Sequence, residues 1–177
     1  MLTHSDIRSL LPHRHPILLV DRVLSYAEGE RIETIKAISG AEPCYADLPE
    51  NAPQAAFRYP ETLLVESFAQ SGALLWLAST RDRGETLDGV GMVAVLSDCV
   101  FEMLVYPGDV VRHEVVLERV LGNNVVFSGA IHGAHGRVAT IDSVIAAFRP
   151  GETLASSENA SDTLLDNANA VVAQTLQ

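Results

Sequence analysis

The stretch RYPETLLVESFAQSGALLWLASTRDR, residues 58–83, decides the fold of this 177-residue chain. Between Glu61 and Thr80 it contains no proline and a single glycine, and its apolar residues fall on every face of a helix. A helix that is apolar all round is a buried helix, so we predict that this segment is the central helix of the domain. One carboxylate, Glu66, and one amide, Gln70, stand a turn apart within it. An unpaired carboxylate in apolar surroundings costs free energy, which makes Glu66 the candidate functional residue.

Runs of residues typical of β-strands lie on both sides of this helix in the sequence. Short turns join the runs that follow the helix, which favours an antiparallel sheet. Because strands both precede and follow the helix, we predict an α+β fold in which one sheet wraps around it. The edges of such a sheet stay open, which favours a dimer. The predicted strands are Ile17–Tyr26, Arg31–Ser39, Val90–Tyr106 (two strands or one bent strand), Asp109–Leu121, Asn124–Gly133 and Gly136–Phe148.

Three further segments complete the predicted organisation. Residues 3–11 are predicted to form a short helix, and residues 40–59, which hold three prolines, an irregular loop. Residues 151–177 contain neither a basic nor an aromatic residue, and their last apolar residues fall at helical spacing. We therefore divide the chain into a domain of residues 1–150 and a C-terminal tail of residues 151–177 that carries a short helix.

The composition excludes several classes of function. The net charge is −11 and Lys36 is the only lysine, which argues against a nucleic-acid surface. No apolar run reaches the roughly 18 residues that a membrane span needs. We see no signal peptide at the start of the chain, and Cys44 and Cys99 form no motif, so we expect a cytoplasmic protein. His132 and His135 flank a turn, but two possible ligands do not make a site, and we predict neither a metal nor a cofactor.

Three motifs occur in order along the chain: LLPHRHPILLVDRV at Leu10–Val23, PETLLVESFAQSG at Pro60–Gly72 and VYPGDVV at Val105–Val111. Together they resemble the hot-dog-fold 3-hydroxyacyl-acyl-carrier-protein dehydratases of fatty-acid synthesis. The resemblance covers residues 8 to 149. It implies an antiparallel sheet curled around a central helix, assembly as dimers, and acyl carrier protein as a partner.

The same resemblance implies a site made by two subunits. In the family, a histidine on the loop before the helix and an acidic residue on the helix share the acid–base work, one from each subunit. Glu66 matches the helix carboxylate, but residues 16–112 contain no histidine, so the loop histidine has no counterpart. Glu61 also stands where the family has a glycine. This chain therefore resembles a divergent member that lacks the loop histidine.

We predict Glu66 as the catalytic residue. His13 and His15 are interpreted as residues that fix the turn into the first strand, and His113 as a satisfied residue of the sheet. The predicted substrate-binding residues are Asn51, Tyr59, Pro60 and Gln70.

Three hypotheses for the function remain open. The first and favoured one is a dehydratase-type subunit for fatty-acid, polyketide or polyene assembly, working as the histidine-less half of a heterodimer in which Glu66 completes a shared site. The second is a self-sufficient enzyme with a rebuilt site, either a dehydratase using Glu66 with Asn51, Asp47 or water, or a thioesterase using Glu66. The third is a non-catalytic protein that binds an acyl thioester or scaffolds a complex.

Overall fold

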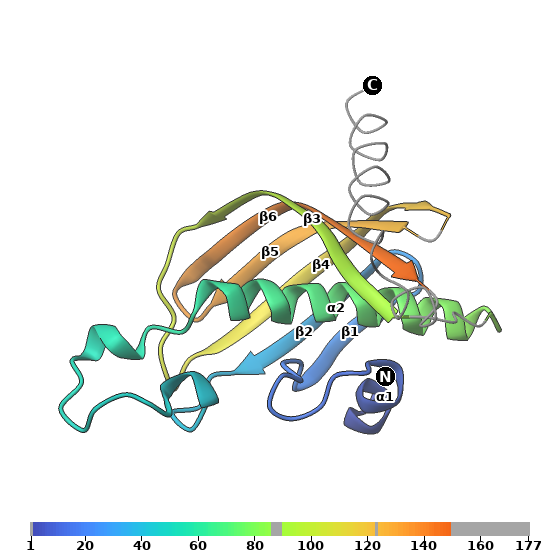
Figure 1. The fold of residues 1–177 in the computed structure, drawn as a ribbon. Helices are drawn as coiled ribbons and strands as arrows, with labels where there is room; N and C mark the ends of the chain where they lie inside the picture. Colours follow the sequence, from blue (N-terminus) through green and yellow to red (C-terminus); the bar gives the residue numbers. More distant parts are fainter. Residues whose placement is uncertain (1, 86–89, 123, 150–177) are drawn as a thin grey trace, which may run out of the picture.

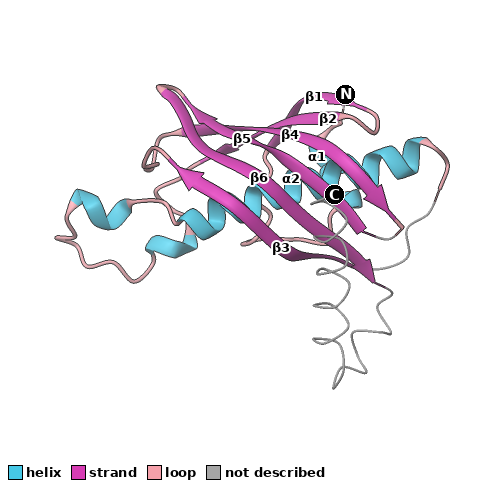
Figure 2. Cartoon of the chain, turned by 90° about the horizontal axis from the view of Figure 1, so that it is seen from above, coloured by secondary structure: helices cyan, strands magenta, loops and turns pink. Residues whose placement is uncertain are grey.

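The computed structural model describes residues 2–85, 90–122 and 124–149, which form a six-stranded sheet curved around one long helix (Figure 1). The long helix is α2, and all neighbouring strands in the sheet run antiparallel in the order β1-β2-β4-β5-β6-β3. Figure 2 shows the strands lying across the length of α2, with β1 and β3 at opposite edges. The elements are α1 (His4–Leu10), β1 (Arg22–Ala27), β2 (Arg31–Ala37), the 3-10 helices η1 (Pro43–Tyr45) and η2 (Gln54–Phe57), α2 (Glu61–Asp82), β3 (Val90–Phe101), β4 (Val110–Leu121), β5 (Asn124–Gly133) and β6 (Gly136–Arg149).

The predicted α+β architecture is confirmed, with corrections to the strand bounds. The second strand ends at Ala37 and not at Ser39, and the run predicted over Val90–Tyr106 is one strand that ends at Phe101. A further correction concerns the first strand. That strand begins at Arg22, whereas the sequence predicted it from Ile17. The backbone of residues 17–19 does not pair with a strand, because the side chain of Gln70 on α2 binds it instead. Gln70 Oε1 accepts from Leu19 N at 2.8 Å, and Gln70 Nε2 donates to Ile17 O at 2.7 Å.

Helix α2 packs its apolar side chains into the concave face of the sheet. Phe68, Leu74 and Leu75 are fully buried there. Helix and sheet approach closely at Gly72, where an added Cβ would lie 2.9 Å from a ring carbon of Phe127 on β5. Any larger side chain at this position would push the helix away from the sheet, so Gly72 sets the spacing between the two layers.

A closed polar network lies between α2 and the sheet; we call Thr34, Ser67, Ser71 and His113 the core network. The hydroxyl of Ser67 lies 2.8 Å from His113 Nε2, and that of Thr34 lies 3.1 Å from His113 Nδ1 and 2.7 Å from Ser71 Oγ. All four side chains are fully buried. Burial lowers the pKa of His113 to about 3, because charging the ring inside the core would cost desolvation energy. The ring is therefore neutral at neutral pH and acts as a structural connector.

The irregular loop over residues 40–59 is held down by a buried ion pair. Lys36 on β2 points into the core and places its ammonium 2.5 Å from Glu42 Oε1. A buried pair of this kind leaves an uncompensated charge when either partner is removed, so it ties the start of the loop to the sheet. The loop contains η1 and η2 and leads directly into α2.

No helix in residues 2–85, 90–122 and 124–149 has the length and hydropathy needed to cross a bilayer. The predicted C-terminal helix falls within residues 151–177, outside the residues that the structure describes.

Candidate functional site

Glu66 lies on the face of α2 next to the one that carries Ser67 and Ser71 of the core network. The sequence predicted a carboxylate buried in the domain centre, and the structure corrects this: the Glu66 side chain is 35% exposed. The sheet covers the helix face that carries Ser67 and Ser71. The neighbouring face, with Glu66, borders a cavity between α2 and the edge strand β3.

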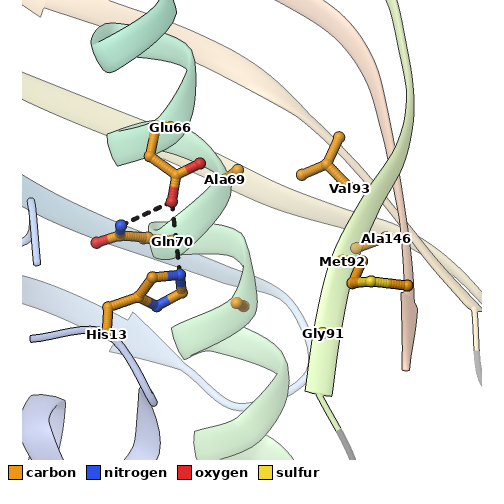
Figure 3. Close-up of a pocket in the computed structure, with 9 residues that line it drawn as sticks. His13, Glu66, Ala69, Gln70, Gly91, Met92, Val93 and Ala146 are labelled. Carbon is orange, nitrogen blue, oxygen red and sulfur yellow. Dashed lines mark hydrogen bonds and ion pairs between the residues drawn. The ribbon is translucent and has the colours of Figure 1, made fainter. Parts of the chain in front are cut away.

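The cavity has a volume of about 210 Å³ and opens to solvent (Figure 3). Two successive turns of α2 form one wall, with Glu66 and Gln70 as its polar groups. Gly91, Met92 and Val93 of β3, with Ala146 of β6, form the opposite wall. The site is thus a small apolar pocket with a few polar groups on one side, which is the usual composition of a small-molecule site.

Gln70 fixes one oxygen of the carboxylate. Its Nε2 donates to Glu66 Oε1 at 2.8 Å, and the same amide binds the backbone at Ile17 and Leu19. Gln70 is itself 2% exposed, so its position is set by the surrounding structure. Within the described residues, Glu66 Oε2 has no hydrogen-bond or ion-pair partner, and this oxygen is available to a molecule in the cavity.

His13 lies beside this pair, which the sequence analysis did not foresee. Its Nε2 is 3.5 Å from Glu66 Oε1, and its side chain is 27% exposed and lines the cavity (Figure 3). The interpretation of His13 as only a turn residue is therefore incomplete. The only signal in the sequence was that His13 and Glu66 both lie in motifs that carry the family resemblance. Nothing local in either segment indicated that they touch.

The other predicted substrate-binding residues do not line this cavity. Asn51 is exposed on the loop between η1 and η2, and Pro60 is the N-cap of α2. Tyr59 is 1% exposed and packs in the core, with its backbone N–H donating to Val105 O at 2.7 Å. Burial raises the pKa of Tyr59 well above its usual value, and its hydroxyl finds no hydrogen-bond partner among the described residues. Of the predicted site residues, the structure brings together Glu66 and Gln70.

A second cavity, of about 310 Å³, lies one turn earlier along α2. Leu63 of α2 lines it, together with residues 16, 17 and 19 and the loop residues Glu42, Pro43 and Cys44. Its walls are mainly apolar, and Pro16 and Ile17 belong to the same segment that carries His13 toward the first cavity. The two cavities therefore lie on either side of the segment of residues 13–19.

Among the described residues, no group of three or more His, Cys, Asp or Glu side chains is placed to hold a metal ion. The chemistry of the site must be judged from a carboxylate, an amide and an imidazole. Such groups can accept, donate or orient a proton.

Comparisons with known proteins show the family and the fold of the chain. The model of a family described as FabA-like domain matches residues 11–147. The 3-hydroxyacyl-(acyl-carrier-protein) dehydratase FabZ of Staphylococcus aureus is 35% identical over 120 residues, which cover 67% of this chain and 76% of that protein.

Two solved structures share the fold. The dehydratase heterocomplex ApeI:P from Xenorhabdus doucetiae superposes with a TM-score of 0.72 at 16% identity, covering 86% of this chain and 97% of that one. A hot-dog-like protein from Thermanaerovibrio acidaminovorans superposes with a TM-score of 0.52 at 18% identity, covering 85% and 93%. The predicted hot-dog fold is confirmed.

Proposed function

The chain belongs to the FabA-like domain family, and from this premise we propose that it is a dehydratase-type subunit acting on 3-hydroxyacyl thioesters carried by acyl carrier protein. We place it in fatty-acid or polyketide assembly in the cytoplasm. The observation that carries the proposal is Glu66, held by Gln70 at one oxygen and open to a cavity at the other.

The reaction needs two proton transfers. A base takes the proton from the carbon next to the thioester, the electron pair forms the new C=C bond, and the C–O bond at the β-carbon breaks. An acid then gives its proton to the departing hydroxyl, which leaves as water. Glu66 supplies one of these two groups, and its free oxygen has access to the cavity where the substrate would lie.

We propose that a partner subunit supplies the second group. Residues 16–112 contain no histidine, so this chain lacks the family's loop histidine. Strand β3 is an open edge of the sheet, and its side chains Val93, Leu96 and Val100 are 46%, 40% and 58% exposed. Val93 also lines the Glu66 cavity, so a dehydratase-like subunit that pairs with this edge would reach the carboxylate. The heterocomplex ApeI:P offers a precedent for such an assembly in this fold.

A second candidate is a self-sufficient enzyme, either a dehydratase or a thioesterase with a rebuilt site. The observation that favours it is His13, an imidazole of the same chain 3.5 Å from Glu66. In this case the single chain would turn over substrate without a partner.

The test is an assay of the purified chain on a 3-hydroxyacyl carrier-protein thioester, alone and mixed with a histidine-bearing dehydratase whose own helix carboxylate has been replaced. Activity only in the mixture, lost on Glu66→Gln, supports the shared site. Turnover by the chain alone supports the second candidate. If neither preparation turns over substrate or forms a complex, the chain is a non-catalytic binding or scaffold protein and the proposal is wrong.

A further inference from the structure

We propose that His13 is a positioning residue for Glu66, a neutral imidazole that donates its Nε2–H to Glu66 Oε1 and does not replace the missing loop histidine as acid or base. The inference rests on the proposed function of the Glu66 site and deepens it. It also distinguishes the shared site from a self-sufficient one.

The two ring nitrogens of His13 have different surroundings. Nε2 faces Glu66 Oε1 at 3.5 Å. Nδ1 is buried and finds no hydrogen-bond partner among the described residues. A neutral imidazole has one donor and one acceptor nitrogen, and a charged one has two donors.

This asymmetry favours one tautomer of the neutral ring. With its proton on Nε2, the ring donates toward a carboxylate oxygen and leaves only a bare lone pair at the buried Nδ1. A proton on Nδ1 would bury a donor without an acceptor, which costs more free energy than leaving an acceptor free. The Nε2–H tautomer therefore directs the donor of the ring at Glu66 and leaves its acceptor at the buried nitrogen.

The backbone around His13 is held so that the ring keeps this direction. The guanidinium of Arg14 donates from Nη1 to Leu11 O at 2.8 Å and to His13 O at 2.7 Å. Further along, Gln70 binds the backbone of residues 17 and 19. Hydrogen bonds within the segment and to α2 therefore hold the backbone on both sides of His13.

The consequence for Glu66 is an ordered carboxylate. Gln70 Nε2 and His13 Nε2 approach the same oxygen, Oε1, and leave Oε2 for the substrate. The present distance to His13 is long for a hydrogen bond, and such contacts shorten when a substrate fills the site and excludes water. Apart from His13 and Glu66, the side chains that line the cavity from α2, β3 and β6 carry no titratable group, and Arg14 is the nearest charged neighbour along the chain.

The experiment compares His13→Gln with His13→Ala in the full chain, each mixed with the histidine-bearing partner. Glutamine keeps an N–H donor near the position of Nε2 but does not titrate, whereas alanine keeps neither. His15→Gln is the matched control, because His15 is an exposed neighbour in the same segment that does not line the cavity.

We expect His13→Ala to lower kcat about 10- to 100-fold with little change in KM, because the carboxylate loses its orientation. His13→Gln and His15→Gln should retain most of the activity, with both limbs of the pH–rate profile unchanged. If His13→Gln is as inactive as His13→Ala, or loses a limb of the profile, His13 is an acid or base and the proposal is overturned. Equal kcat in all variants also overturns it, because His13 would then be only structural.

A second measurement does not depend on activity. In the ¹⁵N-labelled full chain at about pH 8, where an ordinary imidazole is neutral, the long-range ¹H–¹⁵N spectrum identifies which ring nitrogen of His13 carries the proton. The signal is assigned by its loss in His13→Gln. A proton on Nε2 supports the proposal even if no dehydratase activity is found, and a proton on Nδ1 overturns it even if activity is high.

Discussion

Two polar clusters include residues from neighbouring faces of helix α2. They differ in burial and in whether all their hydrogen-bonding atoms have partners. The core network of Thr34, Ser67, Ser71 and His113 is fully buried, and each of its hydroxyl groups and ring nitrogens has a hydrogen-bond partner. The Glu66 site, formed by Glu66, Gln70 and His13, lies against an open cavity and leaves one carboxylate oxygen and one ring nitrogen without partners among the described residues.

The difference indicates which cluster stabilises the fold and which can bind a ligand. A network that satisfies all its members stabilises one arrangement of helix and sheet, and nothing can bind to it. A cluster with unused hydrogen-bonding capacity beside a cavity leaves interactions to be made with a ligand. We therefore expect substitutions in the core network to change stability, and substitutions in the Glu66 site to change activity.

The largest expected effect is on activity. Glu66→Gln removes a group that accepts or donates a proton, and should lower kcat of the mixed enzyme about 10²- to 10⁴-fold. The thermal unfolding midpoint should stay close to that of the wild type, because Glu66 is partly exposed. Glu61→Gln, at the start of the same helix, is the control and should leave kcat unchanged. A comparable loss in that control would mean that the helix surface, and not the site, is sensitive.

The largest effect on stability is expected at the core network. His113→Leu leaves the hydroxyls of Ser67 and Thr34 without their shared partner, and should lower the free energy of unfolding by about 2–4 kcal/mol. Urea denaturation measures this, and kcat of the folded protein should remain near the wild-type value. A large loss of kcat at unchanged stability would contradict the division between the two clusters.

The core network also predicts a pH dependence of stability. The pKa of His113 is about 3 in the folded chain and near 6.5 when unfolded, so between these values the unfolded state binds more protons. Stability from the neutral ring is fully present above about pH 6.5 and is lost as the pH falls toward 3. We expect the wild type to lose about 1–3 kcal/mol more than His113→Leu between pH 7 and about pH 4. Parallel pH profiles for the two proteins would exclude His113 as the cause.

The smallest effect is expected for Ser71→Ala. Ser71 Oγ binds Thr34 Oγ1 at 2.7 Å and the Ser67 carbonyl, while His113 keeps both of its own partners. Two hydrogen bonds are lost, but the Ser67 carbonyl keeps its partner in the helix, so the expected cost is about 1 kcal/mol in the free energy of unfolding. Ser67→Ala, which deprives His113 Nε2 of its partner, should cost more in the same denaturation experiment. The reverse order would show that the ring is not the centre of the network.

Much of the fold could be predicted from local patterns. The second strand was predicted over Arg31–Ser39 and forms over Arg31–Ala37. The helix over residues 61–80 was found almost in full, because a long run without proline that is apolar on every face favours a buried helix. The first strand was predicted too long, because its opening residues bind a side chain of α2 rather than a strand, and no pattern within them indicates this.

The site was predictable only in part. Glu66 stands out in the sequence as a carboxylate in an apolar helix, and its catalytic role stays a prediction. Its exposure was predicted wrongly, because burial depends on where the sheet ends and not on the helix itself. Tyr59 was predicted to bind substrate, and the structure places it in the core, away from the Glu66 cavity.

The sequence by itself determined which segments become the helices and most of the strands, and that Glu66 lies within the central helix. These properties follow from neighbours a few residues apart, whose spacing is written in the chain. Only the tertiary structure decided that His13 meets Glu66 across 53 positions of sequence and that His113 is sealed between helix and sheet. Contacts of that kind depend on how the loops bring distant segments together, and local periodicity carries no information about that distance.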